Sequence, residues 1–273
     1  MNRHIQQYIH SWKLDLRFLY SSIVDGIVVT LLMFLFLGFG KLLEAKAYAI
    51  SGGRPVEEVK MVLLSATPET AELFLQNVKT FAYLFILGSI IVVTLALFLF
   101  SLSRAVLWYH LLHKQLTAKN YWRWNVINLV MLLLLIPYLL LLLLLRLGIN
   151  ILLPISSDTI YSIVTQGVSF LLIVFFFMIL FLTYHSFAER YKVWESLGQA
   201  FHQFKTKGRV LWMVFFFSFL TGIIISLLYS LVQKNLLLYQ TSLVQSIIGA
   251  GVLLLFLSWM RLYLLKAIKA ETL

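Results

Sequence analysis

The chain contains no cysteine. This absence excludes disulfides, thiolate metal sites, palmitoylation and cysteine nucleophiles. Charged residues are also scarce, because they make up 12% of the 273 residues, against about 25% in a typical soluble domain. So few charges cannot cover a surface that faces water on all sides. We therefore expect lipid to form part of the solvent around this protein.

Motifs of common membrane enzymes are missing as well. There is no His-Glu-x-x-His element, no Gly-x-Gly-Asp element of the kind found in intramembrane proteases, and no glycine-rich phosphate-binding loop. His110 and His113 stand at i and i+3 and could share a metal on one helix face, but a structural zinc site takes four ligands. We expect no enzymatic activity, no metal site and no cofactor.

Hydrophobic sequence, by contrast, is abundant: 61% of the residues are hydrophobic, and they gather in six long runs. The runs are Leu19–Phe39, Phe81–Leu102, Val126–Leu147, Gln166–Tyr184, Val210–Val232 and Ser242–Met260. Each is close to the ~20 residues that a helix needs to cross about 30 Å of hydrocarbon. The sequence predicts an all-α protein, a polytopic transmembrane helical bundle with six spans.

The first hydrophobic run predicts a retained span rather than a cleaved signal peptide. It follows a mostly polar segment, it is longer than the ~7–15 residues of a signal-peptide core, and no small-x-small cleavage site closes it. Between the first two runs lies an external loop, residues 41–80, in which a Gly-Gly-Arg-Pro turn precedes a pattern typical of a short helix. We expect residues 1–273 to form a single transmembrane domain that carries this loop.

Positive charge is concentrated on one side of the predicted spans. The net charge is +11, and nearly all of the excess lies in the N-terminal segment, in the segments after the second and fourth runs, and at the C-terminus. Loops rich in Lys and Arg stay in the cytoplasm, so we expect a protein of the cell membrane with both termini cytoplasmic. Anionic head groups attract such a face, so we expect membrane lipids as partners. We expect no binding of nucleic acid.

Asp25 is the acidic residue that falls inside a predicted span. An aspartate at the centre of a membrane helix costs roughly 2.5–3.5 kcal/mol on insertion scales, so such a residue is by default a functional hypothesis. Its candidate partners at the same depth are Arg104, His185 and Arg261. Three interpretations stay open: ion or proton coupling, structural pairing between helices, and a side chain that reaches back to water.

The stretch Arg17-Phe-Leu-Tyr-Ser-Ser-Ile-Val-Asp25-Gly26 resembles the first-helix signature of RDD-family membrane proteins. In that signature an arginine stands about two turns before an intramembrane aspartate. The resemblance implies an ion or solute transporter and carries over only the positions Arg17 and Asp25, although members of that family usually have fewer spans. The layout as a whole is similar to prokaryotic six-span membrane families of unassigned function, the phosphodiesterase-associated membrane domains among them.

Small residues recur at every fourth position in the last two runs. They are Ser218, Gly222, Ser226 and Ser230 in the fifth run, and Ser242, Ser246 and Ala250 in the sixth. In lipid, small side chains at this spacing let helix backbones approach closely. We interpret these ridges as helix contacts, with a polar lining for a solute path as the alternative.

Amphipathic patterns continue past the inner ends of two runs, over residues 102–116 and 187–204. Either stretch can prolong its span or lie along the lipid head groups, and periodicity does not distinguish the two. The spacing His-x-x-Lys-x-x-x-Arg occurs before the first run, at 10–17, and before the fifth, at 202–209. It fits a tandem array of three helical hairpins, or basic residues that gather wherever a chain re-enters the membrane.

Two functions fit these patterns. The Leu- and Phe-rich spans, with few polar groups inside, favour an accessory or lipid-interacting membrane-embedded protein that binds head groups, partner subunits or a second copy of itself through its basic face. The alternative is a small ion or solute transporter, or a permease subunit, that uses Asp25.

Overall fold

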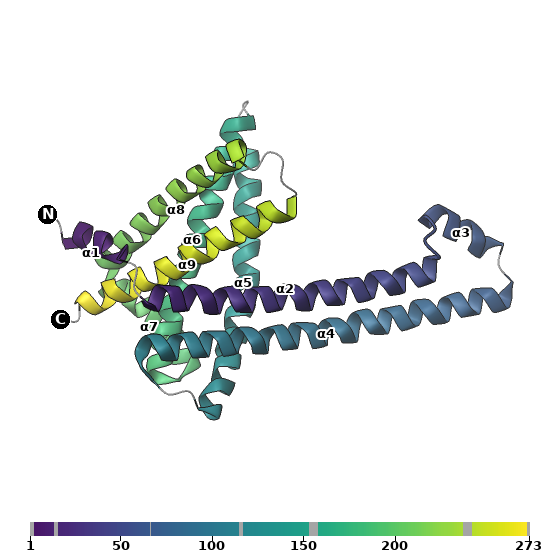
Figure 1. Cartoon of the computed structure of the whole chain (residues 1–273), viewed down its shortest axis with the longest axis horizontal. Coiled ribbons are helices and arrows are strands. Elements are labelled where there is room, and N and C mark those ends of the chain that lie inside the picture. The colour runs from purple at the N-terminus through teal and green to yellow at the C-terminus, as the bar shows by residue number, and fades with distance from the viewer. Residues whose placement is uncertain are drawn as a thin grey trace. The chain divides into compact units, whose positions relative to one another are not determined.

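The structure is a computed structural model, and it describes residues 3–13, 16–65, 67–114, 117–152, 158–236 and 242–271. Within these ranges every regular element is an α-helix (Figure 1), so the all-α prediction is confirmed. The helices are α1 (Arg3–Ser11), α2 (Leu16–Ser51), α3 (Val56–Leu64), α4 (Pro68–Leu112), α5 (Ala118–Leu152), α6 (Asp158–Arg190), α7 (Val193–Thr206), α8 (Gly208–Leu236) and α9 (Ser242–Glu271).

Six of the described helices are long and apolar enough to cross a membrane, namely α2, α4, α5, α6, α8 and α9. They coincide with the six predicted runs, and the chain is a multi-pass membrane protein. The helices are longer than those runs: α2 has 36 residues and α4 has 45, where ~20 suffice for the hydrocarbon. Much of the predicted loop 41–80 is therefore helical, because α2 ends at Ser51 and α4 already begins at Pro68.

The chain divides into two compact units. Unit 1 consists of Met1–Gly26 and Ser103–Leu273, and unit 2 consists of Ile27–Leu102. The boundaries fall inside α2 and α4, so each of these helices gives one end to unit 1 and the remainder to unit 2. A hydrophobic run shows no signal for such a boundary, since its composition is uniform across it.

Unit 2 contains α3, which lies where the sequence predicts a short helix. The turn that leads into it places Gly52 and Gly53 at positive φ (60° and 73°), a region that is unfavourable for residues with a Cβ. Ahead of α4, the Oγ1 of Thr67 accepts a hydrogen bond from the backbone N–H of Thr70 at 3.4 Å. Thr67 thus caps the helix that Pro68 begins.

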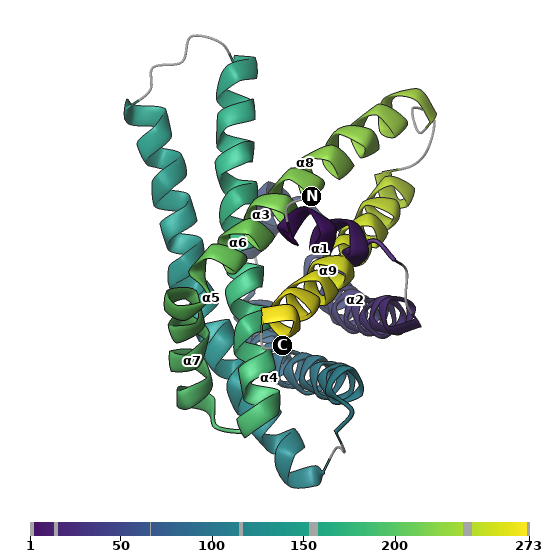
Figure 2. The ribbon, with the colours of Figure 1, turned by 90° about the vertical axis from the view of Figure 1, so that its left-hand side faces the viewer.

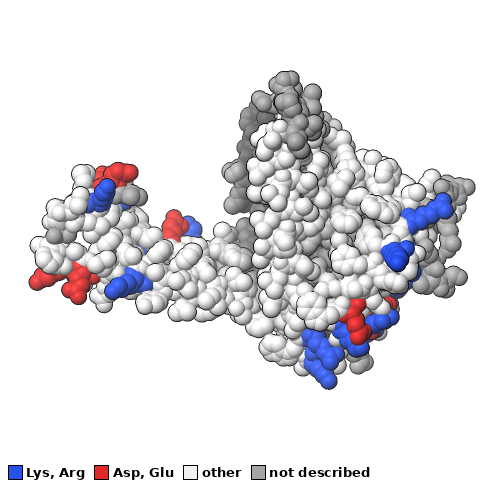
Figure 3. Space-filling model, turned by 180° about the vertical axis from the view of Figure 1, so that it is seen from behind, with Lys and Arg blue, Asp and Glu red and all other residues white. Residues whose placement is uncertain are grey.

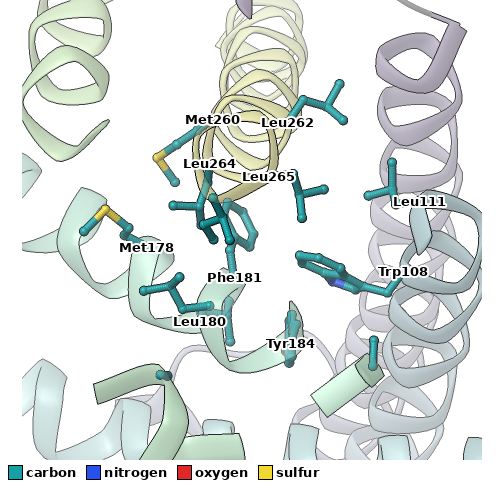
Figure 4. Packing of buried hydrophobic residues seen from close by; sticks show 14 of the residues in the cluster. Trp108, Leu111, Met178, Leu180, Phe181, Tyr184, Met260, Leu262, Leu264 and Leu265 are labelled. Carbon is teal, nitrogen blue, oxygen red and sulfur yellow. The ribbon is translucent and has the colours of Figure 1, made fainter. Parts of the chain in front are cut away.

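Unit 1 has its hydrophobic core at one end of its long helices. The core includes the end of α4, the start of α5, the end of α6, α7, the start of α8 and the end of α9. Figure 4 shows its centre, where Trp108, Phe181 and Tyr184 face Leu264 and Leu265. The opposite halves expose their side chains, Leu139–Leu145 of α5 for example, and in a bilayer such apolar faces contact lipid.

The stretch 187–204 does not prolong its span, whereas the stretch after residue 102 does. α4 continues to Leu112, but α6 ends at Arg190 and the backbone reverses at Tyr191, which has a positive φ of 58°. α7 then packs back against α6, with Gln203 donating to Ser186 at 3.3 Å. Figure 2 shows α5 beside α6, and α8 beside α9, as two helical hairpins of unit 1. The three-hairpin repeat remains a prediction.

Candidate functional site

Three charged side chains meet inside unit 1. The Oδ1 of Asp25, from α2, accepts a hydrogen bond from Arg104 Nη2 of α4, and its Oδ2 accepts one from Arg261 Nη2 of α9 at 2.8 Å. All three residues are buried, with exposed fractions of 3%, 7% and 1% respectively. We refer to Asp25, Arg104 and Arg261 as the ion-pair cluster.

The three helices bring these side chains to the same depth. Asp25 lies nine residues after the start of α2, Arg104 eight before the end of α4, and Arg261 ten before the end of α9. At 1.5 Å per residue, each lies about 12–15 Å from its helix end. These ends belong to the side that the sequence predicts to be cytoplasmic. The cluster therefore joins three helices below their basic ends.

Neighbouring groups hold each guanidinium in place. Arg261 donates a further hydrogen bond from Nη1 to the Oγ of Ser21 at 2.6 Å, and its Cζ lies 5.0 Å from the ring centroid of Phe181. Arg104 donates from Nε to the Oγ of Ser103 at 3.3 Å. Because a guanidinium remains protonated in proteins, the cluster holds two permanent positive charges against one carboxylate.

A second buried polar network lies beside the cluster. The hydroxyl of Tyr184 donates to Asn128 Oδ1 at 2.5 Å, and Asn128 Nδ2 donates to the carbonyl oxygen of Trp124 at 2.9 Å. Tyr184 stands three residues after Phe181, the ring that Arg261 faces, on the same helix. Hydrogen bonding of this kind is what allows polar side chains to be buried among apolar ones. The network ties α5 to α6 at the level where the cluster ties α2, α4 and α9.

Two predicted site residues take other partners. Arg17 Nη2 lies 3.3 Å from His113 Nε2, and His185 Nε2 lies 3.7 Å from Glu189 Oε1, one turn further along α6. The ion pairs of Asp25 go instead to Arg104 and Arg261, two of the three candidate partners from the sequence. In the part of the chain that the structure describes, no three His, Asp or Glu residues gather as a metal site would require.

The predicted ridge of small residues is buried over only part of its length. Ser218 and Gly222 are buried, and a Cβ on Gly222 would meet the ring of Phe170, on α6. Ser226, Ser230, Ser246 and Ala250 are exposed, and the side chain of Ser242 lies outside the described residues. Between α8 and α9 the close approach occurs at Gly249, where Tyr229 packs and donates to the Gln245 carbonyl at 2.8 Å.

The docking of α1 on α8 and α9 was not predicted from the sequence. Tyr8 stacks on Phe217 at 4.7 Å between ring centroids and shares a hydrogen bond of 2.9 Å with Thr221 Oγ1. Trp12, which follows α1, stacks on Trp259 at 4.9 Å. The nine mostly polar residues of α1 give little indication in sequence that this helix packs against others. The spacing of Tyr8 and Trp12, about one helical turn apart, is the feature that could have suggested it.

Several basic side chains at the same end bind backbone carbonyls. Lys114 Nζ donates to the Ala188 carbonyl at 2.8 Å, and Lys207 Nζ donates to the Ile268 carbonyl at 3.5 Å. These carbonyls belong to the last turns of α6 and α9, where a helix leaves carbonyl groups without intrahelical partners and where cations are favoured. Part of the basic character of this face is therefore structural.

Comparison with protein-family models, curated proteins and solved structures finds no match to this chain.

Proposed function

We propose that this protein is a membrane-embedded accessory protein that contacts anionic lipids through its basic face, and that Asp25 holds its helices together instead of carrying an ion or a proton. The observation that carries the proposal is the environment of the Asp25 carboxylate. Each of its two oxygens accepts a hydrogen bond from a different arginine, and 3% of the residue is exposed.

Coupling to an ion or proton makes two demands that this environment does not favour. The carboxylate has to exchange its partner during transport, and water has to reach it from at least one side. Both partners of Asp25 are arginines, which keep their charge at any ordinary pH. To take up a proton or a cation, the carboxylate would have to break its ion pairs with two buried guanidinium groups. Structural pairing therefore fits better than coupling.

The resemblance of the first span to RDD-family proteins is the sequence argument for transport. It rests on the positions Arg17 and Asp25 alone. In this structure Arg17 Nη2 lies near His113 Nε2, and Asp25 forms ion pairs with Arg104 and Arg261. We accordingly propose transport as the second candidate only. We also propose no catalytic role for the cluster, because its charged groups are held in ion pairs and away from solvent.

Exposed tryptophans support contact with the lipid interface. Trp12, Trp122, Trp194 and Trp212 are each 45% exposed or more, and all four belong to segments near the basic helix ends. Tryptophan is enriched where the hydrocarbon meets the head groups. In Figure 3 the Lys and Arg seen on unit 1 gather toward one end of its helices, next to a long uncharged surface.

The same distribution supports a location in the cell membrane with both termini in the cytoplasm, because loops rich in Lys and Arg are retained there. Reporter fusions at the two ends should respond on the same face. Responses on opposite faces would contradict this orientation.

Ion flux into proteoliposomes tests the functional proposal. We expect vesicles with the wild-type protein, under a proton gradient or a sodium gradient, to show the flux of protein-free vesicles, and vesicles with Asp25→Asn to show the same. Flux above background in the wild type that Asp25→Asn abolishes would establish the transport alternative. Wild-type flux that does not depend on Asp25 would equally refute the accessory role, while leaving the structural assignment of Asp25 intact.

A further inference from the structure

An apolar pocket lies in unit 1 between α1, α8 and α9. Its volume is about 300 Å³, and its walls include Trp12, Phe18, Ile225, Val252 and Trp259. These residues come from the segment after α1, the first turn of α2, the middle of α8 and α9. The pocket is independent of the ion-pair cluster, since none of the three cluster residues lines it.

Polar groups occur at one end of this pocket. The lining residues other than Ser11 and Lys13 are aliphatic or aromatic, and these two stand next to Trp12 at the end of α1. Along α9 the lining extends from Leu262 back to Val252, ten residues or about 15 Å of helix. The pocket thus has an amphipathic layout, with one cation at one end and a long apolar wall.

The walls at the polar end are held by specific contacts. Trp259 donates from Nε1 to the Oγ of Ser11 at 3.2 Å, and Ser11 in turn donates to the carbonyl of Tyr8 at 2.6 Å. Trp12 stacks on Trp259 with an interplanar angle of 27°. Pockets that bind small apolar ligands are largely pre-formed in this way.

We propose that this pocket binds an acyl chain of an anionic phospholipid from the cytoplasmic leaflet, with Lys13 beside the head group. The inference rests on the proposed function, which already places anionic lipid at this face, and adds a defined site. Helices α8 and α9 are membrane spans, so the medium that fills an apolar space between them is hydrocarbon. An empty apolar space would leave its lining without dispersion contacts, and a water molecule there would lack polar partners.

A neutral lipid would satisfy the apolar wall equally well, and the preference for an anionic one comes from Lys13. The side chain of Lys13 is exposed near the end of α1. One basic residue at the surface of an anionic leaflet raises the affinity for anionic lipid by about fivefold.

Native mass spectrometry of the detergent-solubilised full chain tests the site. Phosphatidylglycerol and phosphatidylcholine of the same acyl composition are added in turn, and the lipids that remain bound are counted. We expect one phosphatidylglycerol to be retained in preference to phosphatidylcholine. Val252→Phe adds a phenyl ring to the wall of the pocket, narrows the space for an acyl chain and should remove this bound lipid. Leu253→Phe places the same phenyl ring on the next residue, which is exposed and does not line the pocket, and should retain it.

A second pair of variants tests the head-group contact. Lys13→Gln should lower the preference for phosphatidylglycerol about fivefold, and Lys119→Gln, which removes an exposed lysine outside the pocket, should leave it unchanged. If the wild type prefers phosphatidylglycerol but Val252→Phe and Leu253→Phe bind it equally, the pocket assignment is wrong while the proposed lipid contact stands. If the wild type shows no preference for the anionic lipid, the proposed function itself is wrong.

Discussion

Asp25→Ala is expected to lower the free energy of unfolding by about 3–5 kcal/mol, the cost that follows when one partner of a buried ion pair is removed. The substitution leaves Arg104 and Arg261 buried, 7% and 1% exposed, with no carboxylate between them. A lone arginine within a span is costly, and two adjacent ones also repel each other. Asp25→Asn should be less harmful, because the amide oxygen can still accept one of the two hydrogen bonds.

Unfolding from mixed micelles with increasing denaturing detergent, followed by circular dichroism, measures this effect. The matched control is Glu44→Ala, which removes the acid of the Lys41–Glu44 pair on the same helix. That pair has a length of 3.0 Å but side chains that are 79% and 70% exposed, so its loss should change the stability little. Equal midpoints for Asp25→Ala and Glu44→Ala would show that the cluster contributes nothing to stability.

Gly222→Val is expected to destabilise unit 1 by about 1–3 kcal/mol, the usual range for overpacking a well-packed contact. A Cβ at this position would lie 2.7 Å from Cε1 of Phe170. The ring cannot move away freely, because Phe219 and Phe256 lie 5.7 and 6.2 Å from it, centroid to centroid. The added side chain must therefore push α6 and α8 apart.

A double variant tests the contact between Gly222 and Phe170. Phe170→Ala combined with Gly222→Val should be more stable than the sum of the two single losses predicts, since the smaller side chain makes room for the new one. Gly251→Ala serves as the control, because nothing lies within 4 Å of a Cβ there and alanine favours the helix. Strict additivity of the Gly222 and Phe170 substitutions would contradict the packing described here.

The six spans could be predicted from the sequence because span length and apolar content are local properties of the chain. The same reasoning placed Asp25 at its depth and named Arg104, Arg261 and His185 as its candidate partners. It could not choose among them, because depth does not determine which helices are neighbours. The structure gives Asp25 the two arginines, while His185 lies near Glu189, one turn away on its own helix.

The reversal at Tyr191 could not be predicted, because the amphipathic pattern runs through it without interruption. A positive φ at a tyrosine has no signal in sequence, whereas the Gly52–Gly53 turn is signalled by its residue type. The burial of the small-residue ridges could not be predicted from the sequence either. A spacing of four shows that Ser218, Gly222 and Ser226 share a helix face, but only the tertiary arrangement shows that Gly222 meets Phe170 and that Ser226 is exposed.

If the ion-pair cluster serves structure, the combined variant Asp25→Leu/Arg104→Met/Arg261→Met should be close to the wild type in stability. Replacing an entire buried ionic group by apolar side chains of similar size is often neutral or stabilising, while removing one member is not. We predict that the combined variant regains most of the unfolding free energy lost in Asp25→Leu alone, measured by the same detergent titration. A combined variant no more stable than Asp25→Leu would contradict the claim.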